Sequence, residues 1–173
     1  IAFVFMTMFQ VVIALVPGEP LEIVAGYAFG AIWGTVLSMI GIFLGSMLVF
    51  LLVRKFGIKL VEVFFTYEKI KSLQFLQNRK KVAAIIFLMF FLPGTPKDLL
   101  TYFVGLTDIK TKHFLLIATV ARIPSLVTST IGGSLLGVQK YTFAIIVFVV
   151  TFIISVVGWF IYSRLTKEET ENT

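Results

Sequence analysis

Long apolar stretches separated by short charged ones dominate the pattern along the chain. Residues 31–53 and 142–163 contain no charged side chain, and residues 114–136 form a third apolar stretch around a single arginine. A helix of about 20 apolar residues, rising about 1.5 Å per residue, crosses the hydrocarbon core of a bilayer, which is about 30 Å thick. The pattern therefore predicts an all-α integral membrane protein with transmembrane helices at 31–53, 114–136 and 142–163.

Two further apolar segments are each interrupted by proline and glycine. Residues 1–30 contain PGEP at positions 17–20, and residues 82–106 contain PGTP at positions 93–96. Proline lacks a backbone N–H and breaks a helix, and the apolar arms on either side are too short to span a bilayer. We therefore predict re-entrant helical hairpins at 1–30 and 82–106. The residues that would form the breaks are Pro17, Gly18, Pro20, Pro93, Gly94 and Pro96.

The charged side chains indicate an orientation in the membrane. Residues 54–81 carry eight lysines and arginines against two glutamates, and further cations lie at 110–112 and 164–167. Cytoplasmic loops are enriched in Lys and Arg, so these regions are expected in the cytoplasm. Residues 54–81 are then a basic amphipathic cytoplasmic segment, and residues 164–173 a disordered cytoplasmic tail. The segment 82–106 begins and ends on the cytoplasmic side, which is why it must turn back inside the membrane.

The two hairpins share the pattern P-G-x-P-x-acid, because residues 17–22 (PGEPLE) align with residues 93–98 (PGTPKD). Each copy is followed by a transmembrane helix, and the two copies would enter from opposite sides. This arrangement is typical of inverted-topology repeats, in which broken helices at matching positions mark a transporter's substrate site. The repeats would span 1–53 and 82–136, followed by the final helix. The alternative is a coincidence of two proline-glycine kinks.

Three acids follow the predicted breaks, and two cations lie near them. An ionised acid facing lipid costs about 2.5–3.5 kcal/mol, so Glu19, Glu22 and Asp98 are expected to point into a shared cavity and to exchange protons there. Arg122 lies on a helical stripe of small residues, which marks a face that packs against other helices. Its planar donor fork suits a phosphate headgroup, and Lys97 is a second candidate.

Each of these roles has a plainer alternative. An acid in the first turn of a helix is stabilised by the helix dipole, so the three acids could serve as helix caps. Arg122 could form a purely structural ion pair, and Lys97 could extend to the cytoplasmic surface.

Other features narrow the class of protein. The chain of 173 residues has no cysteine and one histidine, and no phosphate-binding loop, zinc-ligand spacing or G-x-S-x-G motif occurs in it. The sequence thus argues against an enzyme and predicts no cofactor or metal. The net charge of +6 is interpreted as loop orientation and contact with anionic lipid, not with nucleic acid. The chain begins at Ile1 inside an apolar run, so further sequence is expected before it. The oligomeric state stays open, a homo-oligomer included.

The stretches PGEPLEIVAGYAFG, FLPGTPKDLLTYFVGLT and ARIPS resemble the VTT-domain family, also known as SNARE-associated Golgi or DedA-like membrane proteins, over about residues 10–137. The resemblance implies two re-entrant hairpins that meet in the membrane. It also implies lipid scrambling or transport in a bacterial plasma membrane, where members are linked to polyprenyl-phosphate recycling. Family arginines near the second hairpin are absent here: Leu92 and Lys97 stand in that neighbourhood, and Arg122 lies farther along.

The resulting hypothesis is a lipid transporter or scramblase with membrane lipids, anionic or phosphate-bearing, as partners. The alternatives are a proton- or cation-coupled carrier of a small solute and a membrane scaffold that transports nothing.

Overall fold

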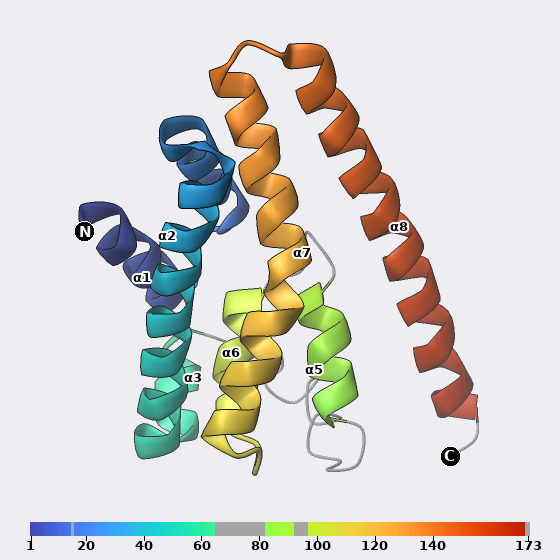
Figure 1. Cartoon of the computed structure of the whole chain (residues 1–173). Coiled ribbons are helices and arrows are strands. Elements are labelled where there is room, and N and C mark those ends of the chain that lie inside the picture. Colours follow the sequence, from blue (N-terminus) through green and yellow to red (C-terminus); the bar gives the residue numbers. More distant parts are fainter. Residues whose placement is uncertain (15, 65–81, 92–96, 172–173) are drawn as a thin grey trace.

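A computed structural model describes residues 1–14, 16–64, 82–91 and 97–171 of the chain. In these ranges the protein consists of helices and the turns that join them, and no strand occurs (Figure 1). The helices are α1 (Ala2–Ile13), α2 (Glu19–Phe56), α3 (Ile58–Phe64), α5 (Val82–Phe91), α6 (Lys97–Gly105), α7 (Thr111–Gly137) and α8 (Tyr141–Glu171). The predicted all-α architecture is thereby confirmed.

Helix α2 consists of two helices that run in opposite directions. Gly30 has non-helical backbone angles, with φ 77° and ψ 170°, a region open to glycine at little cost. The residues before it form a short arm (residues 19–29), and those after it a long arm (residues 31–56). In Figure 1 the short arm rises from the end of α1 to the turn, and the long arm descends beside it. We call α1 and α2 the first unit.

A similar order of helices occurs in α5, α6 and α7, which we call the second unit. Helix α5 ends at Phe91, and the short helix α6 begins at Lys97. A turn after Gly105 leads into the long helix α7. The predicted break residues Pro93, Gly94 and Pro96 lie outside the described residues. In both units a short helix is thus followed by a reversal and a long helix.

The short helix of each unit packs against the long helix of the other unit. The short arm of α2 approaches α7 so closely that a Cβ at Gly26 would lie 2.0 Å from the carbonyl oxygen of Thr130. A Cβ at Gly133 would lie equally close, at 2.0 Å, to the carbonyl oxygen of Ile23. Helix α6 contacts the long arm of α2, where Gly105 faces Val53. Small residues permit this approach, which is how helices associate inside lipid.

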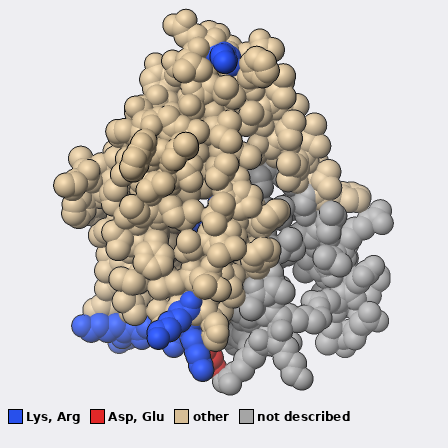
Figure 2. Space-filling model, in the orientation of Figure 1, with Lys and Arg blue, Asp and Glu red and all other residues tan. Residues whose placement is uncertain are grey.

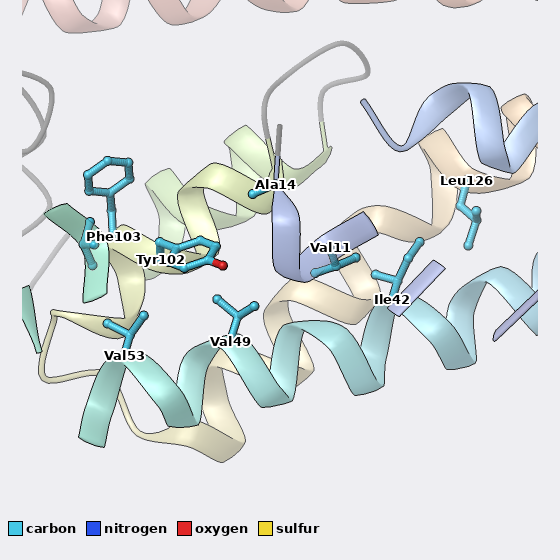
Figure 3. Packing of buried hydrophobic residues seen from close by; sticks show 9 residues of the cluster. Val11, Ala14, Ile42, Val49, Val53, Tyr102, Phe103 and Leu126 are labelled. Atoms are coloured by element: carbon cyan, nitrogen blue, oxygen red, sulfur yellow. The ribbon is translucent and has the colours of Figure 1, made fainter. Parts of the chain in front are cut away.

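Two clusters of buried apolar side chains fill the remaining space. One joins α1, the long arm of α2, α6 and α7, and Figure 3 shows Val49 and Val53 pointing toward Tyr102 of α6. The other centres on Phe114, whose ring stacks on Phe50 at 4.5 Å between centroids and meets Phe90 edge-on. Close packing of this kind holds helices together where the surrounding solvent is itself apolar.

The outer surface is apolar over a broad band. Large hydrophobic side chains are exposed along α8, including Phe143, Ile146 and Phe152. In Figure 2 lysine and arginine gather at the lower end of the visible face, little blue marks the upper end, and the surface between them is almost free of charge. Within the described residues, two helices are long and apolar enough to cross a membrane: Glu19–Phe56, which includes the long arm of α2, and Thr111–Gly137. A crossing by α8 stays a prediction.

The C-terminal region differs from the sequence prediction. Helix α8 continues to Glu171, so residues 164–171 are helical and not a disordered tail. Lysine and glutamate are good helix formers, and they extend a helix that is already nucleated. The predicted basic segment 54–81 is described only as far as residue 64. Its first residues complete α2 and form α3, and the rest lies outside the described residues.

Candidate functional site

A cavity of about 220 Å³ lies where the two units meet, and we call it the central cavity. Its walls come from α1, the connection between α1 and α2, and both arms of α2. The start of α6 and the middle of α7 complete them. Of the described residues in its wall, the charged ones are the five that the sequence analysis selected: Glu19, Glu22, Lys97, Asp98 and Arg122. Pro17 and Gly18 also line it.

The break between α1 and α2 forms one wall of the central cavity. Helix α1 ends at Ile13, and Ala14 adopts a left-handed conformation with φ 55°. Pro20 lies within the first turn of α2, and so it is not part of the break itself as the sequence predicted. Proline is tolerated there because the first N–H groups of a helix have no intrahelical partner. Pro17 and Gly18 remain outside the helices.

Asp98 and Arg122 form an ion pair within the second unit. Arg122 Nη1 donates to Asp98 Oδ1 at 3.0 Å, and the side chains are only 5% and 13% exposed. The guanidinium also lies 4.8 Å from the ring centre of Phe90, close enough for a cation–π contact. Its Nη2 reaches Thr101 Oγ1 at 3.5 Å, whereas Nε has no acceptor among the described residues. Arg122 therefore faces inward and keeps donor capacity.

Among the described residues, Lys97 is held by a hydroxyl group and not by an acid. Its Nζ donates to Ser125 Oγ at 2.5 Å, and Ser125 lies one turn beyond Arg122 on α7. The side chain is buried, so it does not extend to a membrane surface as the alternative interpretation proposed. An ammonium group has three donors, and those not bonded to Ser125 are available to another acceptor.

The two glutamates come from the first turn of α2, three positions apart. Glu22 is buried, and its Oε2 has no hydrogen-bond partner among the described residues. Lys97 and Arg122 lie within electrostatic range of Glu22. Glu19 is less buried. Both acids stand where the helix dipole favours negative charge, so a capping contribution and a role in the cavity are compatible.

A count of charges characterises the central cavity. Three carboxylates face two cations, and one carboxylate is already paired with Arg122. Among the described residues only Lys97 is left to balance the two glutamates, so within this part of the chain full ionisation leaves one negative charge without a partner. An unpaired charge in such a place is costly, and binding a proton or another cation removes that cost. Within the described ranges, no group of three or more acids and histidines is arranged to hold a metal ion.

The sequence analysis missed two polar side chains: Gln10 in the wall of the central cavity, and Tyr102 of α6, which does not line it. Gln10 of α1 donates through Nε2 to the carbonyl oxygen of Val16 at 2.6 Å and to Asp98 Oδ2 at 2.7 Å. The hydroxyl of Tyr102 donates to the carbonyl oxygen of Val12. Broken backbone needs such partners in an apolar medium. Gln10 had a usable signal, because an amide in an otherwise apolar arm is expensive unless it has a partner.

Fold and site together define an α-helical membrane protein with a buried, charged cavity between two similarly ordered helical units. Residues 16–135 match the model of the VTT domain, and the chain belongs to the VTT-domain family, as its motifs predicted. This family is generally linked to membrane transport. Searches of curated proteins and of solved structures gave no significant match.

Proposed function

We propose that this protein is a lipid transporter or scramblase that moves a phospholipid or a polyprenyl phosphate between leaflets. It acts as a transporter and not as an enzyme. The observation that carries the proposal is the gathering of all five predicted charged residues around one cavity beside the break of the first unit. Charges inside a membrane protein are costly and commonly mark the path of a polar substrate.

The size of the central cavity indicates which part of a lipid it would hold. Its volume of about 220 Å³ is below the roughly 300–1,000 Å³ of sites that enclose a drug-sized ligand. A phosphate with part of its headgroup fits this space, whereas acyl chains do not. The chains would stay in the bilayer while the polar end passes through the protein.

The polar groups of the central cavity suit such a headgroup. Arg122 has a donor without an acceptor, and Lys97 is bonded only to a neutral hydroxyl within the described residues. Both would contact phosphate oxygens. The acids of the first unit oppose entry of an anion as long as they are ionised, so Glu19 and Glu22 would take up protons when the headgroup enters and release them when it leaves. Movement would then be coupled to protons.

The placement in the membrane follows from the same proposal. Helices α1 and the short arm of α2 would form one re-entrant hairpin, and α5 with α6 the other, entering from opposite sides as an inverted repeat. Exposed cations cluster at the end where α2 finishes and α7 begins: Arg54, Lys55, Lys59, Lys110 and Lys112. That end, segment 54–81 and the C-terminus would face the cytoplasm of a bacterial plasma membrane and gather anionic lipid.

Reconstitution into vesicles tests the proposal. A fluorescent phospholipid is placed in both leaflets, and a membrane-impermeant reductant bleaches the outer leaflet only. Wild-type protein should let the reductant bleach nearly all of the label. Label that starts in the inner leaflet is bleached only after it has crossed the membrane. This slower bleaching should be strongly retarded in Glu22→Gln, Asp98→Asn and Arg122→Ala, and unchanged in Glu62→Gln and Lys140→Gln, which alter exposed positions. Wild-type rates in all three cavity variants would refute the mechanism.

The volume of the central cavity also favours a second candidate, a proton-coupled carrier of a small anionic solute. In that case a pH gradient would drive uptake of the solute into vesicles, and the fluorescent lipid would not change leaflets. Phosphate uptake by the same vesicles, measured beside lipid movement, separates the two functions.

A further inference from the structure

Gln10 is the one described side chain of the first unit that is bonded to the ion pair of the second. It is 6% exposed, and both N–H groups of its amide are used, one on Val16 and one on Asp98. The carbonyl of Val16 belongs to the break between α1 and α2. The side chain therefore ties that break to the start of α6, which lies 88 positions away in the sequence.

Asp98 is consequently held from two sides. Its Oδ1 accepts from Arg122, and its Oδ2 accepts from Gln10. A free aspartate beside an arginine tends to accept two parallel N–H bonds from the guanidinium fork. Here the second oxygen is engaged elsewhere, and the contact with Arg122 is a single hydrogen bond. This leaves Arg122 Nε without an acceptor among the described residues, although it is buried.

We propose that Gln10 is a positioning residue, which holds Asp98 Oδ2 away from Arg122 and thereby keeps the guanidinium open to an anionic ligand. The part about the anion rests on the proposed function, whereas the contact between the two units does not. When Gln10 is lost, Asp98 turns both oxygens toward Arg122 and competes with the ligand for the same donors.

A reciprocal exchange of the two side chains tests the contact. Gln10→Glu places two carboxylates face to face and should lower the melting temperature of the purified protein. Combining it with Asp98→Asn puts the acid on α1 and the amide on α6, so that one hydrogen bond forms again in the opposite sense. Because Asp98→Asn alone also removes the partner of Arg122, the double variant is compared with both single variants, and its melting temperature should fall by about 2–4 °C less than the sum of their two decreases. A decrease equal to that sum would show independent damage and overturn the contact.

A second measurement uses inorganic phosphate as the probe and tests the positioning role. Phosphate that binds the folded protein raises its melting temperature. We expect a clear rise for the wild type and a several-fold smaller shift for Gln10→Leu, which removes the amide without burying a charge. Gln139→Leu, at an exposed position between α7 and α8, is the matched control and should respond as the wild type does.

The outcomes separate this inference from the proposed function. Equal phosphate shifts in the wild type and Gln10→Leu would overturn the positioning role while supporting an anion site. No shift in the wild type would overturn the anion site, and with it the purpose assigned to Gln10. The reciprocal exchange is read by melting alone, and it decides the contact between the units whether or not the protein moves lipid.

Discussion

The first unit brings two acids and no cation to the central cavity, whereas the second unit brings both cations and one acid. Aligning the two P-G-x-P motifs makes the difference specific. Glu22 stands opposite Asp98, but Leu21 stands opposite Lys97 and Ser46 opposite Arg122. The cavity is therefore assembled from similar helices with dissimilar charges. Negative charge dominates on one side, and an ion pair with an additional lysine lies on the other.

The two helix–helix contacts between the units also differ, in how closely the backbones approach each other. Where the short arm of α2 meets α7, glycines on both helices let the backbones touch. Where α6 meets the long arm of α2, larger side chains lie between the backbones, among them Tyr102, Val49 and Val53. The first contact has no room for adjustment, and the second can be repacked. This suggests that the short arm of α2 and α7 keep one relative position, while α6 has more freedom.

The largest expected effect comes from breaking the ion pair of the second unit. Arg122→Met leaves the largely buried carboxylate of Asp98 without its cation, and we expect the free energy of unfolding to fall by about 3–5 kcal/mol. Unfolding by a denaturing detergent in mixed micelles measures this value. Combining the change with Asp98→Asn should recover part of the loss, because no unpaired charge remains. An equal loss in the single and double variants would contradict the ion pair.

The next effect compares the two helix contacts. Gly133→Ala places a Cβ 2.0 Å from a backbone oxygen, which cannot move aside. We therefore expect the free energy of unfolding to fall by about 3 kcal/mol, at the upper end of the range for overpacked cores. Gly105→Ala places a Cβ 2.8 Å from Cβ and Cγ1 of Val53, a milder overlap than 2.0 Å to a backbone oxygen, so the free energy of unfolding should fall less, by about 1 kcal/mol.

The same detergent titration ranks the two glycine variants. A loss for Gly105→Ala that equals or exceeds that for Gly133→Ala would show that the two contacts are equally tight. The distinction between a fixed and an adjustable contact would then have to be abandoned.

Much of the fold could be predicted from the sequence, because the signals are local. In a membrane protein, a long apolar stretch forms a helix whatever its neighbours are. The motifs predicted the family, and this prediction is confirmed. The inward direction of Arg122 followed from the small residues Ala118, Ser125, Ser129 and Gly133 on the same helical stripe. The structure places Arg122 in the wall of the central cavity, with Ala118, Ser125 and Gly133 buried and Ser129 partly exposed. The roles assigned to the five charged residues stay predictions.

What could not be predicted depends on how distant segments cross. Asp98, one partner of Gln10, lies 88 positions away, and Val12, the partner of Tyr102, lies 90 positions away, so no local spacing in the sequence indicates either contact. The backbone contact between Gly26 and Thr130 likewise exists only once the two helices have crossed. The helix through residues 164–171 was missed for a different reason, since its polar composition suits both a solvated helix and a disordered tail.

The smallest expected effect concerns one hydrogen bond of α6, which lies beside the contact between α6 and the long arm of α2. Tyr102 is buried against α1, and its hydroxyl donates to the carbonyl oxygen of Val12, which lies too near the end of α1 to have a partner within that helix. Tyr102→Phe should therefore lower the free energy of unfolding by about 0.5–1.5 kcal/mol, the net value of one such hydrogen bond. Tyr27→Phe, at an exposed position of the short arm, serves as the control and should change it little. If both variants unfold as the wild type does, the hydroxyl of Tyr102 contributes nothing to closing the break, and α6 is held by its apolar contacts with Val49 and Val53 and by the polar contacts of Lys97 and Asp98.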